Sequence, residues 1–200
     1  MSRAARSILA ALLAILACAL PAGGAQAAAP TENVATATIE QDGGRAFDFA
    51  WDFAKQRGGV VDHANKAHAA ARCTDCEATA IAFQIVIASN ASSVAPTNEA
   101  VALNLECSRC EVVAEARQFV RVVDAPVRLT GAGRRELLDV RRTLRALEAQ
   151  DPPLDQLHQA IEAQEARVRE ILGRELVVKW DPHSDADVLD AWVAQDAELE

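Results

Sequence analysis

The chain has no tyrosine, a single methionine and only 4% aromatic residues, although half of its 200 residues are hydrophobic. With so few large side chains, a buried core must depend on close packing of small residues, and alanine is very common. Cations are also scarce: 20 lysines and arginines stand against 29 aspartates and glutamates, which gives a formal net charge of −9. Because nucleic acids and anionic lipids bind cationic surfaces, this balance argues against both as partners.

The chain also lacks an apolar run of about 20 residues, the length that a membrane-spanning helix needs. Its longest run, residues 8–20, is shorter, follows a basic start and leads into small residues that end at Ala27. This pattern predicts a secretory signal over residues 1–27, cleaved after Ala27, and a secreted or extracytoplasmic mature chain without a transmembrane span. The alternative is lipidation of Cys18 in a loose lipobox, which would make the protein a cell-surface lipoprotein.

Common catalytic signatures are absent as well. The sequence contains no Gly-x-Ser-x-Gly elbow, phosphate-binding loop, dinucleotide fingerprint or His-Glu-x-x-His pair. We therefore assign no catalytic or cofactor-binding residues and expect no cofactor. The absence of the motifs of the usual proteases and hydrolases favours the interpretation that the protein is not an enzyme.

What the chain does contain is a pair of cysteine motifs. Of its five cysteines, Cys18 leaves with the signal, and the other four form two Cys-x-x-Cys motifs, Cys73/Cys76 and Cys107/Cys110. The motifs lie 34 residues apart, and an Ala-x-Ala-x-Gln-x-Val segment in the first copy is matched at the same offset in the second. This self-similarity predicts a duplicated unit.

Three chemistries suit the four cysteines. Export and an even count favour disulfides, and a self-contained unit weakly favours bonds within each motif, Cys73 to Cys76 and Cys107 to Cys110. One alternative is zinc held by the same four thiolates, although the 30 residues between the motifs exceed the usual spacing of about 15–20. The other alternative is thiol–disulfide exchange, for which neither motif has a thioredoxin-like setting.

Periodicity along the chain predicts an α+β fold. Residues 33–56 alternate between apolar and polar around a Gly-rich turn, which predicts a β-hairpin. Apolar residues after the second cysteine pair have helical spacing, so we favour a helix after each pair, although the β-branched residues 85–87 favour a strand. Residues 28–129 would then form one domain that contains the hairpin and the duplicated Cys-x-x-Cys unit.

The last third of the chain has a clearer pattern. Thr130 is suited to cap the first of two amphipathic helices, which Pro152 and Pro153 separate, so residues 130–173 predict an antiparallel helical hairpin. Residues 174–200 predict a short strand followed by an acidic tail, whose final twenty residues carry seven acids and no lysine or arginine.

Several short motifs between Val60 and about Leu176 together resemble segments of one known protein family. They are Val61-Asp62, Asn65, both cysteine motifs, Ala80-x-Ala82-x-Gln84-x-Val86, Pro96-Thr97-Asn98, Gln118-Phe119-Val120 and Pro126-Val127-Arg128-Leu129-Thr130 before Gly133-Arg134-Arg135. This set resembles an extracytoplasmic module of actinobacterial proteins described as peptide zinc metalloproteases. The protease description of that family rests on a separate membrane-embedded part with a His-Glu-x-x-His motif, which is absent here. The resemblance therefore implies a shared exported module without protease activity.

Taken together, the residues predict an exported, non-enzymatic, disulfide-stabilised module that binds a protein or peptide partner. The helical hairpin and the acidic tail are the candidate contact surfaces, and an extracytoplasmic protein or a membrane protease is the expected partner. An extracytoplasmic thiol–disulfide redox protein and a structural zinc-binding domain are the alternatives.

Overall fold

A computed structural model describes residues 31–179 of the chain. The predicted signal, Cys18 and nearly all of the acidic tail lie outside the described residues. Of the helices in the described part, none combines the length and the apolar composition needed to cross a membrane.

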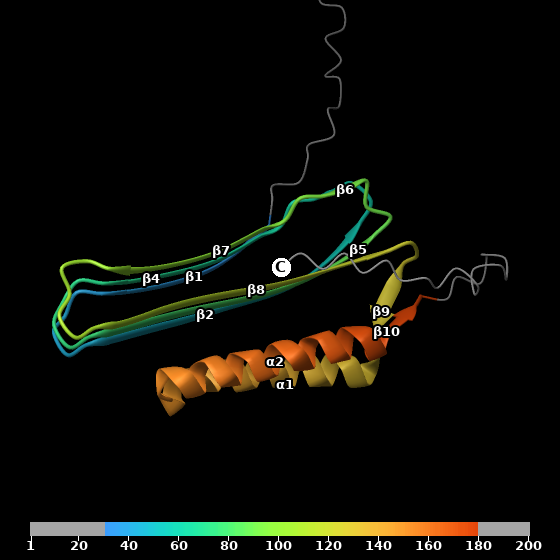
Figure 1. Ribbon diagram of the computed structural model, residues 1–200. Coiled ribbons are helices and arrows are strands. Elements are labelled where there is room, and N and C mark those ends of the chain that lie inside the picture. Colours follow the sequence, from blue (N-terminus) through green and yellow to red (C-terminus); the bar gives the residue numbers. More distant parts are fainter. Residues whose placement is uncertain (1–30, 180–200) are drawn as a thin grey trace, which may run out of the picture.

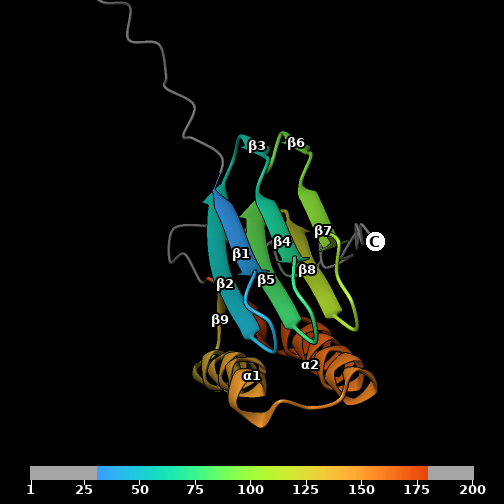
Figure 2. The same ribbon diagram turned by 90° about the vertical axis from the view of Figure 1, so that its left-hand side faces the viewer.

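Between residues 32 and 123 the chain winds into three stacked coils, which make a short parallel β-solenoid (Figures 1 and 2). Coil 1 contains β1 and β2, coil 2 contains β4 and β5, and coil 3 contains β7 and β8. Their bounds are β1 Glu32–Ile39, β2 Arg45–Arg57, β4 Ala64–Ala71, β5 Glu77–Ser89, β7 Thr97–Asn104 and β8 Glu111–Val123. The short strands β3 Val60–Val61 and β6 Ser93–Val94 pair where one coil passes into the next.

Each coil adds one strand to each of two sheets. One sheet has the order β1-β4-β7 and the other β2-β5-β8, and every pairing in them is parallel. Residues in register lie 32 to 34 positions apart, as Arg45, Glu77 and Glu111 show in the second sheet. The repeat is therefore threefold: coil 1, which contains no cysteine, precedes the two copies that the sequence predicts.

The predicted hairpin over residues 33–56 is wrong. β1 pairs with β4 and β2 pairs with β5, so the two strands belong to different sheets and do not pair with each other. The Gly-rich turn between them instead carries the chain from one sheet to the other, with Gly43 at a φ of 64°. Alternation identifies strands correctly, but it does not determine which neighbour a strand pairs with.

The helix favoured after each cysteine pair is also wrong, because these residues form β5 and β8. β5 is buried along nearly its whole length, since one of its faces packs on the other sheet and the opposite face packs on helices. β8, whose residues have the helical spacing, buries Val113 and Phe119 against the helices and Ala116 between the sheets. A strand that buries residues on both faces carries apolar residues without a period of two, so its pattern can imitate a helical stripe. The β-branched residues 85–87 are the signal that indicates the correct structure.

Alanine fills the space between the two sheets. The buried residues of this layer include Ala35, Ala37, Ala67, Ala69, Ala71, Ala78, Ala80, Ala82 and Ala116. Methyl side chains let the sheets approach closely, which explains how a chain with few large residues builds a core. Two stacked polar rows cross the same layer, an asparagine row of Asn33, Asn65 and Asn98 and a glutamine row of Asp52, Gln84 and Gln118.

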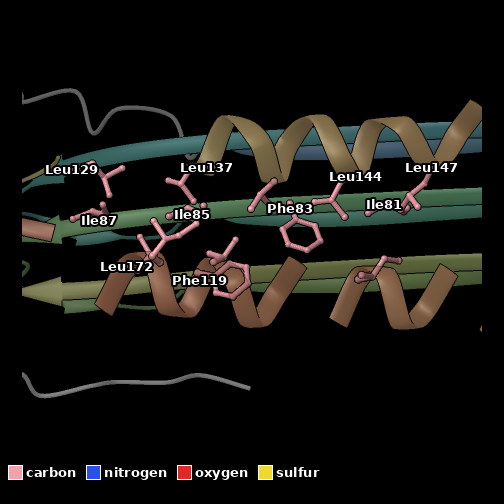
Figure 3. Packing of buried hydrophobic residues seen from close by; sticks show 14 of the residues in the cluster. Ile81, Phe83, Ile85, Ile87, Phe119, Leu129, Leu137, Leu144, Leu147 and Leu172 are labelled. Atoms are coloured by element: carbon pink, nitrogen blue, oxygen red, sulfur yellow. The ribbon is translucent and has the colours of Figure 1, made fainter. Parts of the chain in front are cut away.

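Two helices, α1 (Gly131–Gln150) and α2 (Leu154–Glu175), cover the outer face of the β2-β5-β8 sheet (Figures 1 and 3). The predicted pair of C-terminal helices is thereby confirmed. Phe83 of β5 is fully buried beneath them, and the rings of Trp51 and Phe119 lie 6.1 Å and 5.9 Å from its ring. The strands β9 (Val127–Leu129) and β10 (Leu176–Val178) pair antiparallel and join the two ends of this helical unit.

Thr130 begins α1 as the sequence predicts. Its Oγ1 accepts a hydrogen bond from the backbone N–H of Gly133 at 3.0 Å. Thr130→Ala removes this cap, so we expect the free energy of unfolding to fall by about 1 kcal/mol in a denaturant titration followed by circular dichroism. Thr143→Ala, in the middle of the same helix, is the matched control; an equal loss there would show that the cap contributes nothing specific.

Candidate functional site

The cysteine motifs form the turns between the two sheets, one in coil 2 and one in coil 3. The structure joins Cys73 to Cys76 and Cys107 to Cys110, so both bonds lie within a motif. In each turn the third residue has a left-handed backbone, with φ 55° at Asp75 and 56° at Arg109. The turn of coil 1 has the same conformation at Gly43, but no cysteines.

These turns stack directly on one another. The backbone N–H of Asp75 donates to the carbonyl of Ser108 at 2.9 Å, and the N–H of Glu111 donates to the carbonyl of Cys76 at 3.0 Å. Stacking brings sulfur atoms of different coils together: the Sγ atom of Cys76 lies 3.1 Å from that of Cys110 and 3.8 Å from that of Cys107. All four predicted cysteines therefore meet in one cluster.

An ion pair that sequence reasoning missed also links the turns. The guanidinium of Arg109 hydrogen-bonds the carboxylate of Asp75, which lowers the pKa of Asp75 and raises that of Arg109. Opposite charges at the same position of two copies, 34 residues apart, were the signal that could have revealed it. Both side chains are exposed, so the pair adds little to stability and acts mainly on the alignment of the turns.

The two ends of the solenoid differ in a way that bears on binding. At the coil 1 end, the carboxylates of Asp48 and Asp52 occupy positions that face the space between the sheets, in register with Ala80 and Gln84 of coil 2. The Asp48 carboxylate accepts a hydrogen bond at 2.7 Å from the backbone N–H of Thr36 on edge strand β1. Charges that point inward at a sheet edge prevent another strand from pairing there, so this end is protected.

The coil 3 end carries no such charge at the matching positions. Its inward residues repeat those of coil 2: Asn98, Ala100, Ala102, Ala114, Ala116 and Gln118 are in register with Asn65, Ala67, Ala69, Ala80, Ala82 and Gln84. Nevertheless nearly every residue of β7 is exposed, whereas the inward residues of β4 are buried. Coil 3 thus has the sequence of an interior coil but, among residues 31–179, lies at an end of the stack. We call its strands β7 and β8 the open edge.

The two polar rows end at the open edge, where each still has a hydrogen-bonding group without a partner among the described residues. Gln118 uses its amide N–H groups on the Gln84 side chain, at 2.7 Å, and on the His63 carbonyl, at 3.0 Å. Its Oε1 accepts no hydrogen bond from the described residues. Asn98 donates one N–H to the Ala116 carbonyl at 3.1 Å, and its second N–H has no acceptor in the described part of the chain. A further coil would place a donor beside the Oε1 of Gln118 and an acceptor beside the second N–H of Asn98.

A separate hollow of about 370 Å³ lies at the far end of β2, beside β9 and β10. Four of its lining residues are cations, Lys55, Arg57, Arg128 and Lys179, and none of the lining residues from the described part of the chain is acidic. None of the four forms an ion pair with the described residues. This concentration of positive charge in an acidic protein attracts anions.

The fold and its turns define the class: a three-coil parallel β-solenoid with cysteine turns and a helical cover on one sheet. Comparison with known proteins adds no closer assignment, because no family model matches the chain and no curated protein or solved structure shows a significant similarity to it.

Proposed function

We propose that this protein is an exported, non-enzymatic module that binds an extended segment of a partner protein by strand addition along the open edge. The observation that carries the proposal is the contrast between the two solenoid ends, since one is blocked by inward charges and the other repeats an interior coil. The helical hairpin, which the sequence suggested as a contact surface, uses its apolar face to cover the solenoid. In line with the resemblance, the partner is an extracytoplasmic protein or a membrane protease.

Backbone groups would supply most of the attraction. β7 and β8 contain 8 and 13 residues. Each has one side that pairs with coil 2 and one side on which no strand of the described part of the chain lies. An unpaired strand edge is a template for another strand, and each backbone hydrogen bond formed there contributes about 0.5–1.5 kcal/mol net. Two exposed apolar side chains near the C-terminal end of β7, Leu103 and Leu105, add surface that a partner can cover.

A second copy of the chain fits this edge poorly. Head-to-tail stacking would place coil 1 on coil 3, with Asp48 against Ala114 and Asp52 against Gln118. The Asp52 carboxylate and the free Oε1 of Gln118 are both acceptors, and the contact would bury both aspartate charges. The occupant is therefore a segment of another protein with small uncharged residues at alternate positions and an amide donor opposite Gln118. It runs parallel to β8, because the polar rows continue only in a parallel arrangement.

A charge placed at the open edge tests this proposal. Ala114→Asp places in coil 3 the inward charge that Asp48 provides in coil 1, because position 114 is in register with Ala80 and Asp48. The probe is a labelled 13-residue peptide whose inward residues copy those of β5 and whose outward residues are threonine and lysine. We expect saturable binding to the wild-type protein by fluorescence anisotropy, and at least a tenfold loss of affinity in the variant.

Ala114→Ser is the matched control, since it changes the same half-buried position without adding charge, and it should bind as the wild type does. Circular dichroism checks that both variants are folded. Hydrogen exchange on the wild-type complex should show new protection in β8 and none in β2. Absence of binding, or equal binding by Ala114→Asp, would contradict the proposal. A wild-type dimer that Ala114→Asp dissociates would identify a second copy as the occupant instead.

A further inference from the structure

The solenoid removes the main argument against a metal at the four cysteines. The 30 residues between the motifs are too long for a usual zinc ribbon, but here they form one complete coil that returns the chain to the same place, one strand further along. Backbone bonds hold the turns in position independently of sulfur chemistry, including a parallel bridge between Thr74 and Ser108. The two pairs would therefore stay adjacent if their disulfides were opened.

Two sulfur–sulfur distances across the coils are already close to those of a tetrahedral site. A Zn–S distance of about 2.3 Å requires about 3.8 Å between the sulfurs of a tetrahedron. The Cys76 Sγ atom lies 3.8 Å from that of Cys107 and 3.1 Å from that of Cys110. The Sγ atoms of Cys73, Cys76 and Cys110 all lie within 4.8 Å of one another. To reach this geometry the bonded sulfurs within each motif would need to separate, Cys76 and Cys110 would need to move apart by about 0.7 Å, and Cys107, which lies outside the 4.8 Å group, would need to approach Cys73.

The surroundings of the sulfurs favour a cation once they are reduced. Carbonyl oxygens lie nearby, with Ile39 O 3.5 Å from the Sγ of Cys73 and Cys73 O 3.1 Å from the Sγ of Cys110. Cys73 and Cys76 are buried, so their thiolates would repel these oxygens and one another at low local dielectric. The basic side chain that the second turn carries, Arg109, is already paired with Asp75.

We propose that the reduced protein binds one thiophilic divalent cation of the zinc type through Cys73, Cys76, Cys107 and Cys110. A dithiol supplies the electrons: each protein disulfide gains two electrons and two protons, while one dithiol is oxidised to its own disulfide. Binding of the cation then releases the four thiol protons. The solenoid turns are thus a two-state device, with two disulfides under oxidising conditions and one metal ion under reducing conditions.

The experiment uses the protein reduced with a dithiol and then freed of reductant without oxygen. Titration with Co²⁺ should give one ion per chain, with thiolate-to-cobalt charge-transfer absorption and the intense visible bands of tetrahedral cobalt. Zn²⁺ should abolish these bands by displacement and should raise the Tm of the reduced protein. Two ions per chain, no tetrahedral spectrum, or conversion to a cross-coil disulfide between Cys76 and Cys110 in place of metal binding would overturn the proposal.

The double variant Cys107→Ser/Cys110→Ser removes two ligands and leaves the coil 2 pair intact. It should lose the tetrahedral spectrum and bind cobalt at least a hundredfold more weakly. Equal binding by the variant would overturn the proposal, because one motif would then suffice. If this variant does not fold by circular dichroism, the stoichiometry of the wild-type protein decides alone, since a shared site takes one ion and separate sites take two.

Discussion

Phe83→Ala is expected to lower the free energy of unfolding by about 3–5 kcal/mol, because it deletes the largest fully buried side chain of the protein's described part. Phe83 lies between the solenoid and the helices, beside Phe119 (Figure 3). Its ring also stacks on the ring of Trp51. The layer beneath it consists mainly of alanines and of polar side chains held by hydrogen bonds, so few groups can move to refill the cavity. Urea unfolding followed by circular dichroism measures the loss.

Leu138→Ala is the control for this prediction. Leu138 lies on the outward side of α1 and is 53% exposed, so its truncation should change the free energy of unfolding by no more than about 0.5 kcal/mol. If Phe83→Ala cost as little as Leu138→Ala, the helices would not be packed on the β2-β5-β8 sheet as an essential part of the fold. The distinction matters for function, because this packing fixes one face of the sheet that ends in the open edge.

The sequence predicts the helical unit well for a physical reason. α1 and α2 bury one side and expose the other, so their apolar residues have a clear helical period, and Thr130 and the two prolines mark their limits. β5 has no such contrast because both of its faces are buried, and periodicity then carries little information. This difference explains why the same reasoning succeeds for residues 131–175 and fails after the cysteine motifs.

Coil 1 escaped detection because the cysteines dominated the comparison of repeats. Its turn has Gln41 and Gly44 where coil 2 has Cys73 and Cys76. The signal that could have revealed it is Asn-x-Ala-x-Ala, which begins at Asn33, at residue 65 and again at residue 98. Even with three repeats recognised, the open edge could not have been predicted from composition. The open edge is recognised from the contrast between Asp48 and Ala114, and this contrast is informative only when the two positions are known to lie at opposite ends of the stack.

The asparagine row gives the second prediction with a large effect. Asn65 is fully buried; it accepts a hydrogen bond from Asn33 at 2.8 Å and donates to Asn98 at 2.9 Å and to the Ala82 carbonyl at 3.2 Å. Asn65→Asp keeps the shape but replaces the donor by a carboxylate oxygen that faces two acceptors. We expect a loss of about 3–5 kcal/mol in the free energy of unfolding at pH 7, as for other buried charges without a partner.

The loss should depend on pH with a definite sign. Burial among acceptors raises the pKa of the introduced carboxyl group above its unfolded value of about 3.9, so the folded state binds the proton more tightly than the unfolded state. The variant is then least destabilised below pH 3.9, and the deficit relative to wild type grows as pH rises through and above this value. Urea unfolding at pH 4 and pH 7 measures the difference, and a deficit independent of pH would show that the site is not buried.

Asn98→Asp makes the same change one coil further along, in the exposed row position of the open edge. Solvent can hydrate this carboxylate, so we expect a smaller loss that changes little with pH. The comparison tests the central feature of the molecule, because the two asparagines occupy the same position of successive coils and differ mainly in whether another coil covers them. Equal losses at residues 65 and 98 would mean that coil 3 is already covered. A large difference would show that solvent reaches Asn98 in the free protein, as an edge that is free for a partner strand requires.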